Sequence, residues 1–247
     1  MMRAQPNSRQ TRRPRGEAGI SLVELIVAMT IMSVISAMIL LSWFALSKSY
    51  SYSVTSNKAR DNARQAIARL EREIRDAQGN EATTEVALVR ARPRWIVVST
   101  TFNDALNANP NTLPRLVMYR LYRDGELWRF HDANRDGVIA GVDMSPPDTW
   151  PAANPFNTAE QANGEGRTLL VKDVVNDKVP SVDNPTPLFR YSRYEADGSL
   201  VQDQVYLGST NRGRVVAVQV NLMVDINPER SPIYTEFQTT AQLRNQR

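Results

Sequence analysis

The sequence contains no cysteine and only one histidine, His131. Without cysteine, the chain can form neither a disulfide bond nor a thiolate metal site. A catalytic triad or a metal site built on several imidazole groups has only this one candidate. The sequence also lacks a glycine-rich phosphate-binding loop and a G-x-S-x-G nucleophile motif. These absences lead us to expect that the chain is not an enzyme.

Basic charge is concentrated at the N-terminus. The 247 residues contain 30 Lys and Arg against 26 Asp and Glu, which gives a net charge of +4. Residues 1–19 hold five arginines and one acidic residue, which leaves 25 basic and 25 acidic residues in the remainder. Since the remainder is formally neutral, the basicity indicates targeting rather than a nucleic-acid-binding face. We predict no nucleic-acid contact.

A long apolar run follows the basic segment. The 22 residues from Leu25 to Leu46 contain no charged residue, and about 20 residues suffice to span a bilayer. The arginines before the run are expected to stay in the cytoplasm, which places the C-terminal part on the far side of the inner membrane. The small residues Ala18 and Gly19 precede the run, whereas a secretory signal peptide carries its cleavage site after the apolar core.

Glu24 lies at the start of this run, in the segment "GISLVEL". A carboxylate at the centre of a spanning helix costs about 2.5–3.5 kcal/mol and usually marks a function. The segment resembles the N-terminus of type IV prepilins and pseudopilins, in which a basic leader ends in glycine and glutamate is the fifth mature residue. Gly19 would be the last leader residue and Ile20 the first mature residue. Two features depart from the family pattern, because Ile20 replaces the usual phenylalanine and Glu17 lies in the leader.

The resemblance implies processing and assembly roles for three residues. A prepilin peptidase would cleave after Gly19, and the new amine of Ile20 would be N-methylated and stay cationic. In a filament, the Glu24 carboxylate of one subunit would meet the N-terminal amine of its neighbour, so that two buried charges are paired. The alternative for Glu24 is a carboxylate that reaches the membrane interface of a lone anchor.

A second helical pattern continues beyond the apolar run. Apolar residues recur every three or four positions, which is typical of an amphipathic helix; they are Ala59, Ala63, Ala66, Ile67, Leu70, Ile74 and Ala77. Gly79 and Asn80 are a stop signal, and the Ser/Tyr-rich residues 47–56 predict a bend or a frayed join. We interpret the charged positions of this helix as a solvated face. The segment "ARLEREIRDA" resembles the corresponding helix of minor pilins and of pseudopilin J of type II secretion.

The rest of the chain has the pattern of a β-rich domain. Asp124-Gly125 and Asp197-Gly198 separate strand-like runs and predict hairpin turns. The expected strands are 94–101, 116–123, 126–131, 168–175, 188–194, 201–207, 215–224 and 234–243. The final "TTAQLRNQR" resembles the last strand of the minor pilin and pseudopilin group.

We therefore predict an α+β fold in which a long N-terminal helix packs on a mainly antiparallel β-sheet domain. The expected parts are a cleaved leader at 1–19, a helix at 20–80 with its membrane or filament-core part at 20–46, and an extracytoplasmic β-rich domain at 81–247. Two loops interrupt this domain at 103–114 and, rich in proline, at 144–167, and the second is long enough to suggest a function. Its residues Trp150 and Phe156 either bind a partner or pin the loop to its own domain.

The segment "DANRDGVIAGVD", residues 132–143, matches a calcium-loop template. Gly137 supplies the sharp turn and Ile139 packs inward, and the predicted ligands are Asp132, Asn134, Asp136, the backbone carbonyl of Val138, and Asp143. The spacing also resembles dockerin-type calcium loops, which accept aspartate at the last position. The alternative is an Asx-rich turn without metal. Calcium, in a structural role, is the one cofactor that the sequence suggests.

Together these features predict a minor pilin or pseudopilin subunit. The expected partners are a prepilin peptidase, other pilin or pseudopilin subunits, and the inner membrane with its assembly platform. The subunit would lie in the bacterial inner membrane before assembly and in a type IV pilus or a type II secretion pseudopilus afterwards, at the tip or within the filament. The alternative is a single-span, membrane-anchored extracytoplasmic binding protein that does not polymerise.

Overall fold

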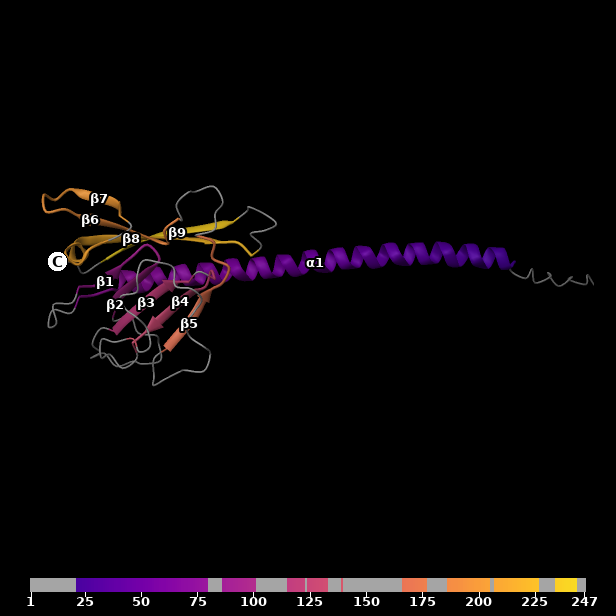
Figure 1. The fold of residues 1–247 in the computed structure, drawn as a ribbon, viewed down its shortest axis with the longest axis horizontal. Coiled ribbons are helices and arrows are strands. Elements are labelled where there is room, and N and C mark those ends of the chain that lie inside the picture. Colours follow the sequence, from indigo (N-terminus) through magenta and orange to yellow (C-terminus); the bar gives the residue numbers. More distant parts are fainter. Residues whose placement is uncertain are drawn as a thin grey trace, which may run out of the picture. The chain divides into compact units, whose positions relative to one another are not determined.

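The computed structural model describes residues 21–79, 86–100, 115–122, 124–132, 139, 166–176, 186–204, 207–226 and 234–243. By its contacts the chain divides into two compact units, Met1–Tyr52 and Ser53–Arg247. The helix α1 (Leu22–Arg75) contributes residues to both units. The second unit contains two antiparallel β-sheets, which are labelled in Figure 1. The predicted α+β class is therefore confirmed.

α1 is one helix of 54 residues, and it continues without interruption through residues 47–56. The frayed join predicted for this Ser/Tyr-rich stretch is absent, because a helix that is already formed on both sides extends through weak helix formers at a cost of only a few tenths of a kcal/mol per residue. The helix ends at Arg75, before the predicted stop at Gly79. There the chain leaves the helix to pair with the first sheet, since Ala77 bridges to Thr100 and the Gln78 N–H donates to the Ser99 carbonyl at 2.8 Å.

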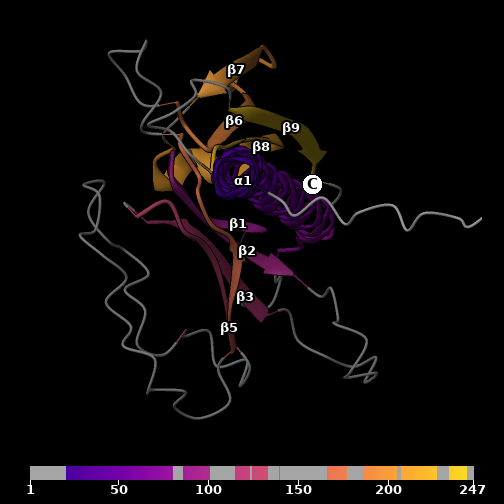
Figure 2. The same ribbon diagram turned by 90° about the vertical axis from the view of Figure 1, so that its right-hand side faces the viewer.

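The apolar stripe predicted for the second half of α1 is confirmed. Its members are buried in the main core of the second unit, with Ala59 partly buried against that core. The buried members are Ala63, Ala66, Ile67, Leu70, Ile74 and Ala77. In Figure 2, which looks along α1, strands β8 and β9 lie on one side of the helix and β1, β2 and β3 on the other. The helix therefore supplies the layer between the two sheets of this unit.

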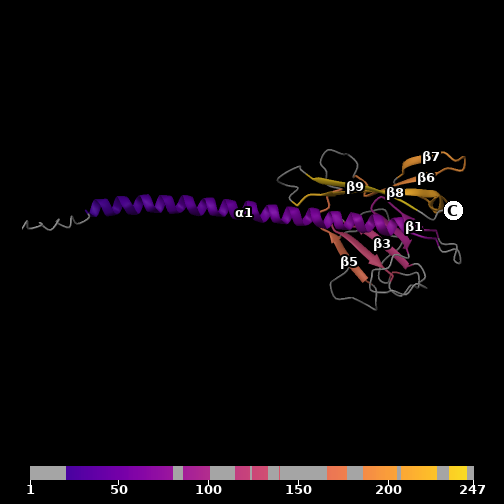
Figure 3. The same ribbon diagram turned by 180° about the vertical axis from the view of Figure 1, so that it is seen from behind.

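Both sheets are antiparallel throughout, and their order follows the chain closely. The first sheet has the order β1-β2-β3-β4-β5 and the second β7-β6-β8-β9. The strands are β1 (Leu88–Ala91), β2 (Trp95–Thr100), β3 (Arg115–Leu121), β4 (Leu127–His131), β5 (Gly166–Val171), β6 (Phe189–Tyr194), β7 (Leu200–Gln204), β8 (Val215–Val224) and β9 (Thr235–Gln242), with a 3-10 helix η1 (Ser209–Arg214) before β8. Figure 3 shows β8 and β9 from the opposite side.

All eight predicted strands are present, with shifts at their ends. The prediction missed β1, whose four residues are too short to give an alternating pattern. Strand β5 begins two residues earlier than predicted and ends at Val171 rather than at residue 175. It ends early because the chain turns at Asp173, which has a φ of 61°, and Val174 then bridges to Val224 of the second sheet.

Both predicted Asp-Gly hairpin turns are confirmed. Gly125, between β3 and β4, has a φ of 84°, and Gly198, between β6 and β7, has a φ of 83°. Such left-handed backbone favours glycine over residues with a Cβ. At Gly125 a Cβ would also lie 2.8 Å from the carbonyl oxygen of Val174, so this turn allows the close approach of the segment that follows β5.

The segment 174–176, which follows β5, joins the two sheets. The Val174 N–H donates to the Gly125 carbonyl at 2.9 Å, and the Val175 N–H donates to the Met223 carbonyl at 2.9 Å. The buried Asn176 side chain continues the pairing: its Nδ2 donates to the Asn221 carbonyl at 2.7 Å and its Oδ1 accepts from the Met223 N–H at 2.9 Å. An amide side chain thus supplies hydrogen bonds that a neighbouring strand would otherwise make.

The side chains form two hydrophobic clusters. The larger one combines the buried side of α1 with residues of both sheets. Examples are Leu70 of α1, Val98 of β2 and Val220 of β8. The smaller one lies on the other face of the first sheet and consists of Trp95, Val97, Leu116, Met118, Tyr122, Phe130 and Ile139. Since β3 contributes to both clusters, every one of its residues is buried.

Candidate functional site

The N-terminal part of α1 carries the residues predicted to act in assembly. Among the described residues, α1 is the one helix long and apolar enough to cross a membrane, with a mean hydropathy of 2.4 over its most apolar 18 residues. None of that window is buried within the chain. A helix that is apolar all round needs a lipid or protein environment to cover it.

Three hydroxyl groups within this apolar part are satisfied by the helix itself. The Thr30 Oγ1 donates to the Ile26 carbonyl, the Ser33 Oγ to the Thr30 carbonyl, and the Ser42 Oγ to the Met38 carbonyl, each at 2.8 Å. These bonds remove the main cost of taking a hydroxyl out of water. They leave the apolar run compatible with lipid hydrocarbon.

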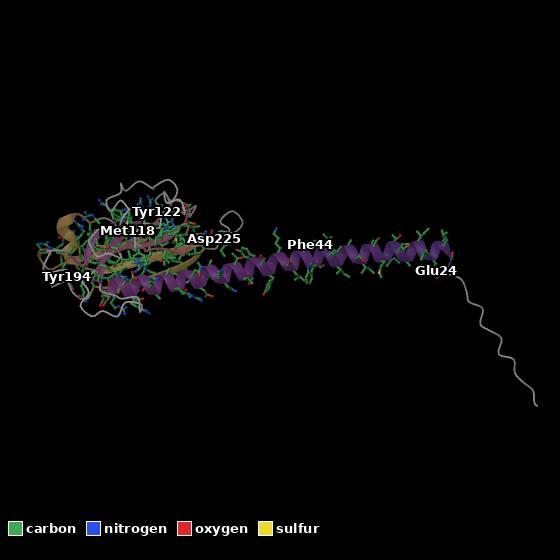
Figure 4. The ribbon with its side chains drawn as sticks, turned by 90° about the horizontal axis from the view of Figure 1, so that it is seen from below. Glu24, Phe44, Met118, Tyr122, Tyr194 and Asp225 are labelled. Atoms are coloured by element: carbon green, nitrogen blue, oxygen red, sulfur yellow. The ribbon has the colours of Figure 1, made fainter. Side chains whose placement is uncertain are left out.

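Glu24 lies in the first turn of α1 and is exposed (Figure 4). The Leu25 N–H donates to the Ser21 carbonyl at 3.1 Å, which closes the first turn around it. Within the described part of the chain, the Glu24 carboxylate has no hydrogen-bond or ion-pair partner. A carboxylate in this position interacts favourably with the positive end of the helix dipole. Gly19 and Ile20 lie outside the described residues.

The predicted calcium loop begins at the end of β4. Asp132 is fully buried, and its backbone N–H donates to the Leu116 carbonyl at 2.9 Å. Ile139 is also buried, in the smaller hydrophobic cluster. The other predicted ligands, Asn134, Asp136, Val138 and Asp143, lie outside the described residues, as do Trp150 and Phe156 of the proline-rich loop. Among the described side chains no group of three His, Cys, Asp or Glu could hold a metal ion, so calcium binding stays a prediction.

A buried charge cluster lies where α1 meets the first sheet, and sequence reasoning missed it. Glu73 was assigned to a solvated face, but its side chain is 0% exposed. Arg129 of β4 donates from Nη2 to Glu73 Oε1 at 2.9 Å and from Nε to both carboxylate oxygens at 3.1 Å. The Tyr119 hydroxyl donates to Oε2, and the partly exposed Arg69 donates from Nε to Oε1 at 3.3 Å. The assignment was wrong because the carboxylate has a strand guanidinium to pair with in the core.

The register of the first sheet brings these groups together. Tyr119 of β3 and Arg129 of β4 are direct cross-strand partners, so their side chains leave the sheet on the same side. Burial and then the Glu73 carboxylate raise the pKa of Tyr119 well above its usual value. The phenol therefore stays protonated and acts as a hydrogen-bond donor.

His131 continues the cluster towards the surface. Its Nδ1 lies 3.0 Å from Arg129 Nη1, and since a guanidinium can only donate, Nδ1 accepts in this contact. The ring lies directly on Gly166, the cross-strand partner of His131 in β5. A Cβ on Gly166 would come within 1.8 Å of His131 Cε1, so the imidazole occupies the space of the missing side chain.

One signal in the sequence could have predicted that Glu73 is buried. It follows Leu70 by three residues and Ala66 by seven, so it falls on the same side of the helix as the apolar stripe. A carboxylate at such a position indicates a buried partner, but its partners are 46 and 56 residues away in the sequence. The buried position of Glu73 could be predicted from the sequence, whereas its pairing with Tyr119 and Arg129 could not.

Comparison with known proteins adds one finding about the N-terminal segment. Residues 14–40 match the family model described as the prokaryotic N-terminal methylation motif. The match includes Gly19, Ile20, Glu24 and most of the apolar run. No curated protein sequence matches the chain.

Proposed function

We propose that this type IV pilin-like precursor serves as a minor subunit of a type IV pilus or of a type II secretion pseudopilus. The observation that carries the proposal is the methylation motif at residues 14–40, with the junction Gly19–Ile20 and with Glu24 at the fifth position after it. In this proposal the prepilin peptidase cleaves after Gly19, and Ile20 becomes the methylated N-terminus.

The physical argument for assembly concerns Glu24. Its carboxylate is exposed at the start of an apolar helix and has no partner within the described part of the chain. Packing of that helix against others would bury the carboxylate, and an unpaired buried charge costs several kcal/mol. The amine of Ile20 on a neighbouring subunit supplies the opposite charge and three N–H donors or fewer, according to its methylation.

Size supports a minor rather than a major subunit. Removal of the 19 leader residues leaves 228 of the 247 residues, which is long for the bulk protein of a filament in the family that the N-terminus resembles. We place the subunit at the filament tip or in its initiation. Pilus and pseudopilus remain the two candidate systems, and deletion of the gene, scored for twitching and for exoprotein export, distinguishes between them.

The proposal is tested by N-terminal analysis together with a charge substitution. Intact-mass measurement on protein from native membranes is expected to give a chain that starts at methylated Ile20. Glu24→Ala should be processed normally but fail to enter sheared filaments, whereas Asp61→Ala, which removes an exposed carboxylate from the same helix, should enter them. An unprocessed chain in cells with an active peptidase, or normal incorporation of Glu24→Ala, would instead favour an anchored protein that does not polymerise.

We further propose that the loop 132–143 binds calcium in a structural role. The placement of Asp132 and Ile139 supports this proposal, because both are buried, Asp132 directly after β4 and Ile139 in the smaller hydrophobic cluster. A cation there would neutralise carboxylates held close to an apolar core. The ion would rigidify the domain and take no part in catalysis.

A further inference from the structure

Four aromatic side chains lie around α1 where its apolar run ends. They fall within ten residues of one another, and all are exposed, from 47% for Tyr52 to 74% for Tyr50. Trp43 and Tyr50 are seven residues apart, about two helical turns, so they lie on one side of the helix, while Phe44 and Tyr52 lie on other sides. We refer to Trp43, Phe44, Tyr50 and Tyr52 as the aromatic girdle.

The chemistry of the girdle fits the headgroup layer of a lipid bilayer. Tyrosine and tryptophan combine an apolar ring with an O–H or N–H donor, and both types are enriched at membrane–water interfaces. The residues before the girdle form the apolar run, and Lys48, within the girdle, is the first charged residue after Glu24. The girdle therefore lies where an apolar environment changes to an aqueous one.

The spacing between the girdle and Glu24 matches the thickness of a bilayer. Trp43 follows Glu24 by nineteen positions, which in a helix corresponds to a rise of about 28 Å. The hydrocarbon core of a bilayer is about 30 Å thick. When the girdle lies at one interface, the Glu24 carboxylate thus reaches the opposite interface.

We propose that the aromatic girdle sets the depth of the unassembled subunit in the membrane and thereby keeps Glu24 hydrated at the cytoplasmic interface. This inference rests on the proposed function in so far as it takes the helix to be a membrane span before assembly. The hydroxyls of Thr30, Ser33 and Ser42 are satisfied within the helix, and no charged residue lies between Glu24 and the girdle to oppose this depth. Glu24 then becomes desolvated only when the subunit enters a filament and a neighbour's amine can pair with it.

The absence of native cysteine allows a direct measurement of depth. Single nitroxide labels are attached to Ser21→Cys, Val34→Cys and Ala45→Cys in the full-length chain, reconstituted in phosphatidylethanolamine–phosphatidylglycerol vesicles. Depth is measured from the ratio of collisions with oxygen and with a water-soluble nickel chelate. Val34, midway between Glu24 and Trp43, is expected to be deepest, with the labels at 21 and 45 both near the headgroups. A label at 21 or 45 that is as deep as the one at 34 would overturn the proposal.

A girdle variant tests the cause of this depth. Replacing all four girdle residues by leucine lengthens the apolar run, so the deepest position is expected to move towards the C-terminus by about one helical turn. The matched control is Tyr194→Leu, which removes an exposed tyrosine of the β-domain (Figure 4) and should leave the depth profile unchanged. An unchanged profile in the girdle variant would overturn the proposal. If that variant also failed to enter filaments, the girdle would belong to subunit packing instead.

The depth measurement is independent of the assembly test. It uses vesicles without peptidase or assembly platform, and Glu24 is retained in every labelled chain. If Glu24→Ala blocks incorporation but the depth profile does not centre on Val34, the proposed function stands and the girdle proposal fails. If the profile centres on Val34 and follows the girdle while Glu24→Ala enters filaments normally, the girdle proposal stands and the proposed function fails.

Discussion

Arg129 pairs with Glu73 across 56 residues of sequence, and neither side chain is more than 1% exposed. The guanidinium comes from a central strand of the first sheet and the carboxylate from the buried side of α1. Because each charge satisfies the other in the core, the pair fixes how the second half of the helix lies on that sheet. Removing one charge leaves the other buried and uncompensated, whereas removing both charges together leaves no such charge.

Arg129→Leu is expected to destabilise the second unit by about 3–5 kcal/mol, because it leaves the Glu73 carboxylate buried without its main partner. The double variant Glu73→Met, Arg129→Met should recover a large part of this loss. Urea unfolding of the full-length chain in detergent, followed by tryptophan fluorescence, measures both free energies. The control is Arg75→Ala, which breaks the half-exposed pair with Glu71 and should cost no more than about 1 kcal/mol. An equally small cost for Arg129→Leu would contradict the role given to the buried pair.

Two buried tyrosines should make the fold less stable at alkaline pH. Burial raises the pKa of Tyr191 well above its usual value, and burial together with the Glu73 carboxylate does the same for Tyr119. In the unfolded chain both phenols lose their protons near pH 10, whereas in the folded chain they keep them. The stability they contribute is therefore fully present below about pH 10 and is lost as pH rises towards the folded-state values.

Each buried phenol should lower the free energy of unfolding by about 1.4 kcal/mol per pH unit above pH 10. Tyr191→Phe and Tyr119→Phe should each make the free energy of unfolding, measured with urea, decline less steeply between pH 9 and 11. Any loss of stability that a variant shows at neutral pH is separate from this change of slope. Tyr194→Phe changes an exposed phenol and should leave the slope as it is. Parallel curves for all three variants would show that Tyr119 and Tyr191 do not cause the decline.

The sequence predicted those parts of the fold whose information is local. The stripe from Ala63 to Ala77 follows from helical periodicity, and the turns at Gly125 and Gly198 follow from Asp-Gly pairs between apolar runs. The N-terminal methylation motif was readable for the same reason, since Gly19, Ile20 and Glu24, on which the resemblance rests, lie within six residues of one another. Such features need no knowledge of how distant segments pair.

The missed polar contacts depend on the pairing of distant segments. Glu73 is buried because Tyr119 and Arg129 come together in the sheet register, and no pattern near Glu73 reports that register. Asn176 looks like a loop residue, yet its amide completes the pairing with β8. Periodicity indicates which side of an element faces the core, but it does not indicate which polar side chains the core can satisfy.

Gly166→Ala should destabilise the first sheet although the substitution adds only one methyl group. The new Cβ would lie 1.8 Å from His131 Cε1, so the imidazole must leave its place beside Arg129, at a cost of about 1–3 kcal/mol. Adding His131→Ala should restore much of the loss, because the space is then free. Gly208→Ala is the control, since nothing lies within 4 Å of its Cβ position. A result for Gly166→Ala within about 0.5 kcal/mol of the wild type would mean that the ring is not held there.

Calcium should raise the thermal stability of the full-length chain in detergent if residues 132–143 bind it. Binding to the folded state alone stabilises by about 2.7 kcal/mol when the free ion exceeds its dissociation constant a hundredfold. Because the twelfth position is the short Asp143 instead of glutamate, we expect weak binding, in the range of about 10⁻⁴ to 10⁻³ M. The melting temperature should therefore be higher in about 10 mM CaCl₂ than in EDTA, and magnesium at the same concentration should have a smaller effect.

The substitution Asp136→Asn should weaken this response to calcium, while Asp197→Asn, in the exposed turn before Ser199, should keep it. Equal melting temperatures in EDTA and in calcium would favour the metal-free Asx-rich turn, in which the same side chains bind only backbone N–H groups.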